Sequence, residues 1–254
     1  STLSWKPLAE IKKGDQVAVS GMLDWSGKAY TISFTADRGR KEFSFPSMTS
    51  DDLLWFLGFY VGDGYTDTSR VYIAVPLTDK SFQKIIDLIK RMFGLTPEIK
   101  RNVVRYNSTK FVDFVKSIGF AGTARTKKVP HWVYTLPKSQ ITAFIDGYIA
   151  ADGYRRSNHK NVSITSVSRE LLQQIKILAY VTDYQPRKIS QWKRREKKPL
   201  GKEIKTYSHH FLYFGDGQKH TPVQFVKVLD IQSLGEKVTY DIEVENANFL
   251  ANGF

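Results

Sequence analysis

The chain has 254 residues, 41% of them hydrophobic and 13% aromatic, which is enough for one large domain or two smaller ones with buried cores. Its formal net charge of +13 indicates a polyanionic partner, most often nucleic acid and less often an anionic membrane surface. The absence of cysteine excludes disulfides, thiolate metal sites and cysteine nucleophiles. We find no signal-peptide core in "STLSWKPLAEIKKGDQ" and no apolar run long enough for a membrane span, so we expect an intracellular protein, cytoplasmic or nucleoid-associated and not secreted.

In the first half of the chain, the spacing of apolar residues changes near Asp51. Before it, short alternating runs such as "DQVAVSG" and "KAYTISFTA" predict strands and turns. From Asp51, the apolar run "LLWFLGFYV" predicts a helix, with Ser50 as its N-cap. The elements expected next are, in order, a strand (70–78), a helix (79–94), one or two basic strands (96–107) and a helix (108–119).

The second half repeats this order of elements. Asp63 and Asp152 are separated by 89 residues, and so are Pro97 and Pro186. We therefore interpret residues 48–220 as a tandem duplication of an αββαββα-like unit. The predicted α+β organisation has four parts: a β-rich segment (1–47), a first repeat (48–136), a second repeat (137–220) and a second β-rich segment (221–254).

Two short segments carry the functional signal. Both "FLGFYVGDGY" (56–65) and "DGYIAADGY" (146–154) are apolar runs that end in Asp-Gly-Tyr. They resemble the two LAGLIDADG motifs of homing endonucleases. The resemblance implies a pseudo-twofold pair of helices above a DNA-binding saddle of strands, in a monomer that cuts both strands of double-stranded DNA across the minor groove and leaves a short 3′ overhang.

Small residues in both segments fit close helix packing, which would bring the two terminal carboxylates together. The small residues are Gly58 and Gly62 in the first copy and Gly147, Ala150 and Ala151 in the second. Carboxylates crowded at the negative ends of two helices are unfavourable unless a divalent cation lies between them. Mg²⁺ prefers such hard oxygen ligands. We expect Mg²⁺, replaceable in binding by Mn²⁺ or Ca²⁺, with Asp63, Asp152, Gly62 and Ala151 as ligands; the simpler alternative is that each aspartate only ends a helix.

A basic group is expected near each scissile phosphate. The resemblance to intein endonucleases, which carry a Lys-x-Pro block before the second motif, selects Lys128 as catalytic, with Lys127 as the alternative if the register shifts by one. Lys219 lies 91 residues beyond Lys128 and is the candidate in the second half. Each of these lysines could instead be a solvated surface charge.

Basic residues interleaved with apolar ones predict DNA-binding strands. The densest stretch, 187–205, fits a twisted hairpin in the major groove, because a disordered tail would not interleave apolar residues with its charges. The candidate DNA-binding residues are Arg38, Arg40, Lys41, Lys100, Arg101, Arg105, Lys110, Arg187, Lys188, Gln191, Lys193, Arg194, Arg195, Lys197, Lys198 and Lys205.

Both ends of the chain resemble parts of the Hint domain, the self-splicing domain of inteins. "WKPLAEIKKGDQV" and "YDIEVENANFLANG" carry this resemblance and suggest a small β-rich module built from both ends. No N-terminal nucleophile, activating histidine or terminal His-Asn is recognisable, and Ala247 stands where the family has histidine. Because splicing needs all three groups, we predict that this chain does not splice.

The resulting hypothesis is a monomeric, Mg²⁺-dependent homing endonuclease acting on a long, asymmetric DNA site. Three alternatives stay open: a catalytically inactive DNA-binding regulator on the same scaffold, an RNA maturase, and a splicing element that carries the nuclease as a passenger. The aspartate pair argues against the first, and the intein-like flanks argue against the second. The five histidines form no HExxH or HNH-like pattern, and we expect His209 and His210 on a strand.

Overall fold

The structure is a computed structural model that describes residues 4, 6–20, 25–35, 44–155, 161–196, 205–215, 223–233 and 235. Its contacts divide the chain into two compact units, one formed by both ends (1–24 with 218–254) and one by residues 25–217. No helix in the described ranges is long and apolar enough to cross a bilayer.

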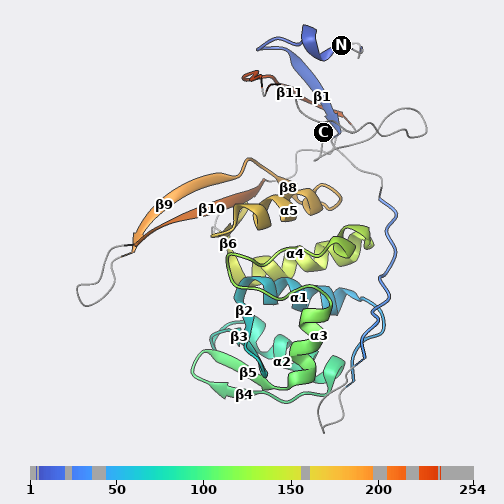
Figure 1. The fold of residues 1–254 in the computed structure, drawn as a ribbon, viewed down its shortest axis with the longest axis vertical. Helices are drawn as coiled ribbons and strands as arrows, with labels where there is room; N and C mark the ends of the chain where they lie inside the picture. The colour runs from blue at the N-terminus through green and yellow to red at the C-terminus, as the bar shows by residue number, and fades with distance from the viewer. Residues whose placement is uncertain are drawn as a thin grey trace. The chain divides into compact units, whose positions relative to one another are not determined.

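The first unit holds a two-stranded antiparallel sheet that joins the two ends of the chain (Figure 1). Strand β1 (Gln16–Ser20) pairs with β11 (Val223–Lys227) through five residue pairs, and a short 3-10 helix (Leu8–Glu10) precedes them. The β-rich segments expected at the two ends are therefore partly present and pair with each other. The intein-like block after residue 235 lies outside the described residues.

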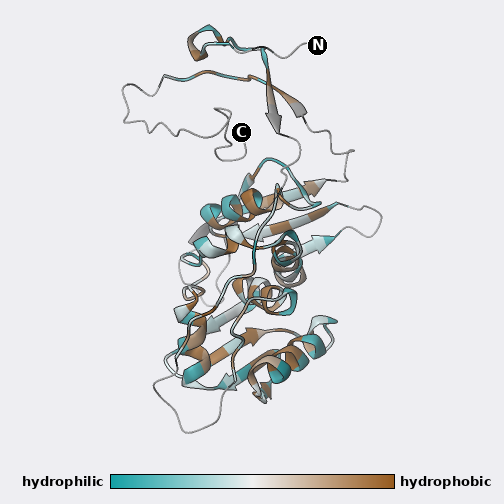
Figure 2. Cartoon of the chain, turned by 90° about the vertical axis from the view of Figure 1, so that its right-hand side faces the viewer, coloured by the Kyte–Doolittle hydropathy of each residue, from teal (hydrophilic) through white to brown (hydrophobic). Residues whose placement is uncertain are grey.

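The second unit is built around two central helices, α1 (Asp51–Asp63) and α4 (Lys138–Asp152). Ser50 caps α1 as expected, with its hydroxyl oxygen accepting from the backbone N–H of Leu53 at 3.3 Å. Every residue of α1 from Leu53 to Val61 is buried. A helix that is apolar on all sides needs cover on all sides, and Figure 2 shows this helix pair in the middle of the unit, between the other elements.

An antiparallel sheet follows each central helix. The first has the order β2-β3-β5-β4, with β2 at Gly64–Thr66, β3 at Arg70–Ala74, β4 at Glu98–Lys100 and β5 at Val103–Asn107. The second has the order β6-β7-β10-β8, with β9 also paired to β10; the bounds are β6 Gly153–Arg155, β7 Val162–Ser166, β8 Gln185–Pro186, β9 Ser190–Glu196 and β10 Lys205–Gly215. In Figure 1 the first sheet lies below the helix pair, and the β9–β10 pair of the second sheet lies above it and reaches to the left.

Three amphipathic helices complete the described part of the unit; one packs on α1, and the other two pack on the sheets. They are α2 (Ser81–Phe93), α3 (Thr109–Ser117) and α5 (Arg169–Ala179). Gly94 ends α2 in the left-handed region at φ +65°, and Ser108 caps α3, both as the sequence predicts. The first half thus runs αββαββα; the described part of the second runs αββαβββ, and no third helix is described there.

Residues 25–35 differ from the strand expected for "KAYTISFTA". Only Thr31 forms a bridge, with Met48, and the segment packs on the connection between the two halves instead. The Trp25 indole N–H donates to the carbonyl of Leu136 at 2.6 Å, and the ring of Tyr30 stacks on that of Trp132 at 4.9 Å. The side chains of residues 25–35 therefore contact neighbouring parts of the chain, and the segment does not form a sheet ladder.

Candidate active site

The central helices touch through two glycines in a reciprocal arrangement. A Cβ placed on Gly58 would lie 1.9 Å from the carbonyl oxygen of Phe144, and one placed on Gly147 would lie 1.9 Å from that of Trp55. Gly147 lies 89 residues after Gly58, and Phe144 lies 89 residues after Trp55, so the two contacts are equivalent in the two repeats. Because only glycine permits this approach, the small residues noted in the sequence are what brings the helices together.

The close approach continues to the ends of the helices, where the aspartates lie. A Cβ on Gly62 would lie 2.6 Å from the Cβ of Ala151 and 3.3 Å from Oδ2 of Asp152. The contacts therefore advance along both helices in the same direction, and the carboxylate of Asp152 lies beside the last turn of α1. Asp63 is the last residue of that turn. The structure thus brings together the four residues that the sequence predicted as metal ligands.

The environment of both carboxylates is unfavourable for their charges. Burial, together with the negative charge of Asp152 and against the opposing Lys127 ammonium, raises the pKa of Asp63 to about 7. Burial also raises the pKa of Asp152, again against Lys127. The free energy of the unliganded site would fall if a cation or protons neutralised the pair.

Among the described residues, Lys127 is a lysine that lies at this site. Its side chain is 3% exposed, and its ammonium donates to the carbonyls of Tyr60 and Val61 at 2.9 Å each and to that of Gly64. An ammonium has three N–H donors, so all three are used by the backbone at the end of α1 and the start of β2. Burial lowers its pKa to about 8, against the attraction of Asp152 and Asp63.

Lys128, our first choice from the sequence, points elsewhere. Its ammonium pairs with the carboxylate of Glu170 at 3.0 Å, and both side chains are more than half exposed. The alternation of buried and exposed side chains distinguishes the two lysines. Lys127 and Val129 are both buried while Lys128 between them is exposed, as in an extended segment that turns alternate side chains inward. Lys219 lies outside the described residues.

The predicted DNA-binding residues fall on several elements. In the first half, Lys100 and Arg105 lie on strands β4 and β5, Arg101 lies in the turn between them, and Lys110 lies on helix α3. In the second half, Arg187 and Lys188 follow β8, while Gln191, Lys193, Arg194 and Arg195 lie on β9 and Lys205 begins β10. Arg38, Arg40, Lys41, Lys197 and Lys198 lie outside the described residues. The predicted hairpin is present as β9 paired with β10, although β10 extends to Gly215, ten residues beyond the basic stretch.

Comparison with known proteins supports part of this picture. Residues 139–214 match the family model described as a LAGLIDADG-like domain, which confirms the resemblance for the second motif helix and the elements that follow it. An iron–sulfur cluster assembly SufBD family protein of Mycobacterium leprae (strain TN) is 29% identical, over 99% of this chain and 34% of the relative. An A-type ATP synthase protein of Pyrococcus abyssi (strain GE5 / Orsay) is 27% identical, over 63% of this chain and 16% of the relative. The chain thus spans about a third or less of these two relatives.

Among solved structures, variants of the homing endonuclease I-DmoI align with a TM-score of 0.43 and 15% identity, over 65% of this chain and 84% of that one. At this TM-score the likeness carries no weight, and the geometry of the chain itself has to carry the functional inference.

Proposed function

We propose that this chain is a site-specific endonuclease that hydrolyses both strands of double-stranded DNA with a divalent metal ion. The observation that carries the proposal is the convergence of Asp63 and Asp152 at the ends of two helices held together by reciprocal glycine contacts. One aspartate at a helix end is common. Two that converge in a half-buried site, where both charges are penalised, are hard to explain by helix termination alone.

The residues present fit a hard divalent cation such as Mg²⁺. The site offers two carboxylates whose charges Lys127 offsets only in part, and Gly62 and Ala151 precede them in the chain with their backbone carbonyls. Within the described ranges no group of three or more acidic or histidine side chains gathers at one point, so water and phosphate would complete the shell. When bound, such an ion polarises a phosphodiester and lowers the pKa of a water.

Lys127 then acts as a positioning residue. Its three bonds tie together the carbonyls of Val61 and Gly64 and that of Tyr60, which also accepts from the Gly64 N–H, and they fix the turn that carries Asp63. Its positive charge also favours the ionised form of both aspartates. A lysine whose donors are all engaged has none left for a phosphate, so its contribution in this arrangement passes through Asp63.

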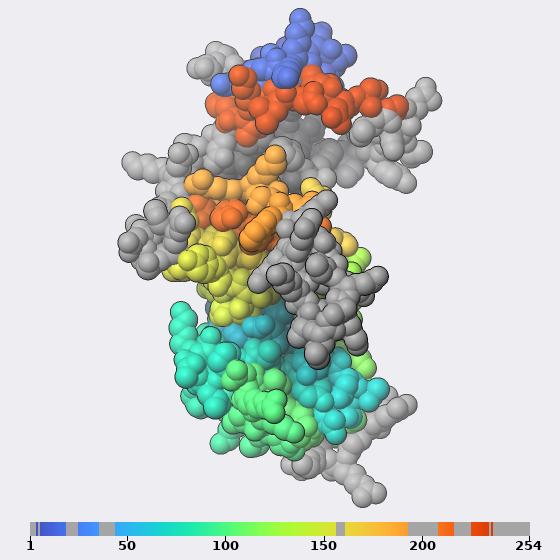
Figure 3. Space-filling model, turned by 90° about the vertical axis from the view of Figure 1, so that its left-hand side faces the viewer, coloured from blue at the N-terminus to red at the C-terminus, as the bar shows by residue number. Residues whose placement is uncertain are grey.

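Double-stranded DNA is the substrate that the charge supports. The net charge is +13, and basic residues are concentrated along β9 and at the turn between β4 and β5. A strand pair is one of the elements that B-DNA admits in its major groove. Figure 3, which views the chain from the left-hand side of Figure 1, shows both halves on that face, the first in cyan and green and the second in yellow and orange. One duplex could therefore meet both.

The two relatives add an independent argument. An iron–sulfur assembly protein and a component of an ATP synthase share no activity in their names, yet each contains a segment similar to this chain. In the first relative the similarity covers 99% of the chain, including both ends. A segment that recurs inside unrelated proteins is typical of an inserted element, and an intein-type homing endonuclease is such an element.

The test is cleavage of a plasmid library with randomised and genomic inserts, in Mg²⁺ or in EDTA. We expect metal-dependent cutting at a rare site, lost in an Asp63→Asn, Asp152→Asn double variant that still binds DNA. Asp113→Asn, which makes the same change on the exposed face of α3, is the matched control and should cut normally. Salt-sensitive binding without cutting by the unaltered protein would contradict the proposal and favour an inactive DNA-binding regulator.

A further inference from the structure

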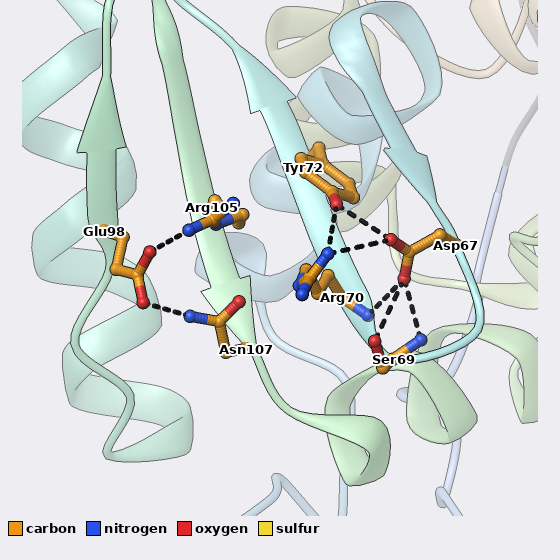
Figure 4. Close-up of polar contacts among 7 residues, drawn as sticks. All are labelled: Asp67, Ser69, Arg70, Tyr72, Glu98, Arg105 and Asn107. Carbon is orange, nitrogen blue, oxygen red and sulfur yellow. Dashed lines mark hydrogen bonds and ion pairs between the residues drawn. The ribbon is translucent and has the colours of Figure 1, made fainter.

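The solvent face of the first sheet carries two carboxylates among its basic residues (Figure 4). The strand register places Tyr65, Tyr72, Arg105 and Glu98 in one row across β2, β3, β5 and β4. The opposite face, with Val71 and Val104, is fully buried against the core. The row therefore forms part of the surface that we propose meets DNA.

Glu98 holds two neighbouring side chains of β5 at once. One carboxylate oxygen accepts from Nη2 of Arg105 and the other from Nδ2 of Asn107. Figure 4 shows all three residues converging, Glu98 from β4 and the other two from β5. Nε of Arg105 is buried and has no hydrogen-bond partner among the described residues. The guanidinium is therefore held by its bond to Glu98 and by the packing that encloses its Nε.

Neither stability nor affinity explains this carboxylate. The ion pair is largely exposed, with Glu98 at 55% and Arg105 at 30%, and exposed pairs contribute only about 0–1 kcal/mol. On a surface that approaches phosphates, a carboxylate also weakens binding through repulsion. What Glu98 does provide is orientation, since a guanidinium and an amide held in place lose less conformational entropy when they meet a base edge.

Asp67 is a different case. Its Oδ1 accepts from the backbone N–H groups of Ser69 and Arg70 at 2.7 Å each, which shapes the turn between β2 and β3. Its Oδ2 accepts from the hydroxyl of Tyr72 at 2.8 Å. Because removing Asp67 would also disturb that turn, Glu98 is the carboxylate whose effect on orientation can be tested separately.

We propose that Glu98 is a positioning residue that orients Arg105 and Asn107 to read two base pairs in the major groove. This proposal rests on the proposed function. Arginine forms two hydrogen bonds to the edge of a guanine, and asparagine forms two to the edge of an adenine. Residues two apart on one strand face are separated by about 6.8 Å, which equals roughly two base-pair steps of 3.4 Å. We therefore expect the two base pairs to lie two steps apart.

The test is selection of bound duplexes from a randomised library, followed by affinities for single base-pair changes. The proteins are the unaltered chain, Glu98→Gln and Arg105→Ala. Asp52→Asn is the matched control, because it removes a carboxylate that pairs with an arginine, Arg91, in the helical layer instead of on the sheet. Thermal melting of each variant checks that it folds.

We expect Arg105→Ala to lose roughly 5- to 150-fold of discrimination at one base pair, which is the range for one bidentate contact. Glu98→Gln should lose at least about fivefold at that base pair and at one more, while its non-specific binding tightens because a negative charge is gone. Asp52→Asn should keep both the base-pair discrimination and the non-specific affinity of the unaltered chain. A structural role for Glu98 would instead weaken binding to all sequences equally.

Two outcomes would overturn the inference, and they differ in what they leave standing. If the unaltered chain selects a motif and Glu98→Gln selects the same one with equal discrimination, Glu98 does not position readers, and the endonuclease proposal survives. If the unaltered chain binds duplexes without selecting any motif, then both the readout and the site-specific function fail.

Discussion

Replacing Gly58 with alanine should separate the central helices. The new Cβ would lie 1.9 Å from the carbonyl oxygen of Phe144 and 2.8 Å from its carbonyl carbon, whereas real contacts of this kind stay beyond 3.0 Å. The helices must therefore move apart by about 1 Å at this point. The obstacle is backbone inside a helix, so no change of side-chain rotamer can relieve it.

The expected loss of stability follows from two opposing terms. Overpacking of a well-packed core costs roughly 1–3 kcal/mol, and a clash with backbone belongs at the upper end. Alanine is about 1 kcal/mol better than glycine in a helix interior. We therefore expect the free energy of unfolding to fall by about 2 kcal/mol. A double variant with Gly147→Ala should lose less than twice this, because the same interface has already opened.

Urea denaturation measures the stability, and cleavage of the selected site measures activity. Activity should fall more than the folded fraction does, because a shift of about 1 Å between catalytic groups can cost 100-fold in rate. Asp113→Ala on the exposed face of α3 is the control for a new alanine in a helix. A Gly58→Ala protein as stable and as active as the original would refute the close-packing argument.

Three further predictions concern charge. In EDTA, stability should decline as the pH rises from about 4 to about 7, because the raised pKa of Asp63 makes the folded state bind more protons there; thermal melts of Asp63→Asn should show a flatter profile. Burial lowers the pKa of His210, so the unfolded state binds more protons below about pH 6.5 and stability should fall as the pH drops through that range, an effect absent in His210→Phe. Lys127→Met removes one donor from each of three carbonyls, of which that of Tyr60 keeps the Gly64 N–H, and should lower the free energy of unfolding by about 2 kcal/mol or more, with loss of cleavage. Lys128→Met, measured in parallel, should stay within about 0.5 kcal/mol of the original because its ion pair is exposed.

Local signals account for much of the fold. Ser50, Ser108 and Gly94 mark helix ends through side-chain and backbone preferences that act within a few residues, and all three are found where expected. The glycines that bring α1 and α4 together were also recognisable, because the period of the helix places them on one face.

What the sequence could not supply depends on partners far along the chain. Lys127 and Lys128 are identical residues side by side, and the carbonyls that hold Lys127 inward lie more than 60 residues earlier in the chain. The pairing of Glu98 with both Arg105 and Asn107 requires the register of β4 against β5, and a shift of one residue would point Glu98 to the opposite face. The segment 25–35 has the alternation of a strand, yet its backbone bonds go to Thr135, at the end of a 3-10 helix (His131–Thr135), and to Ser47 and Thr49.

The sheet formed by β1 and β11 bears on how this protein folds. Ser20 and Val223 are register partners, so about 200 residues separate two neighbours in one ladder. Each doubling of a flexible loop adds about 0.6 kcal/mol to the entropy cost of closure, and such non-local pairings form slowly. Until the intervening chain is compact, β1 and β11 remain unpaired strand edges, which are templates for aggregation. Rapid folding of the central helices and sheets would therefore shorten the time for which these two edges stay exposed.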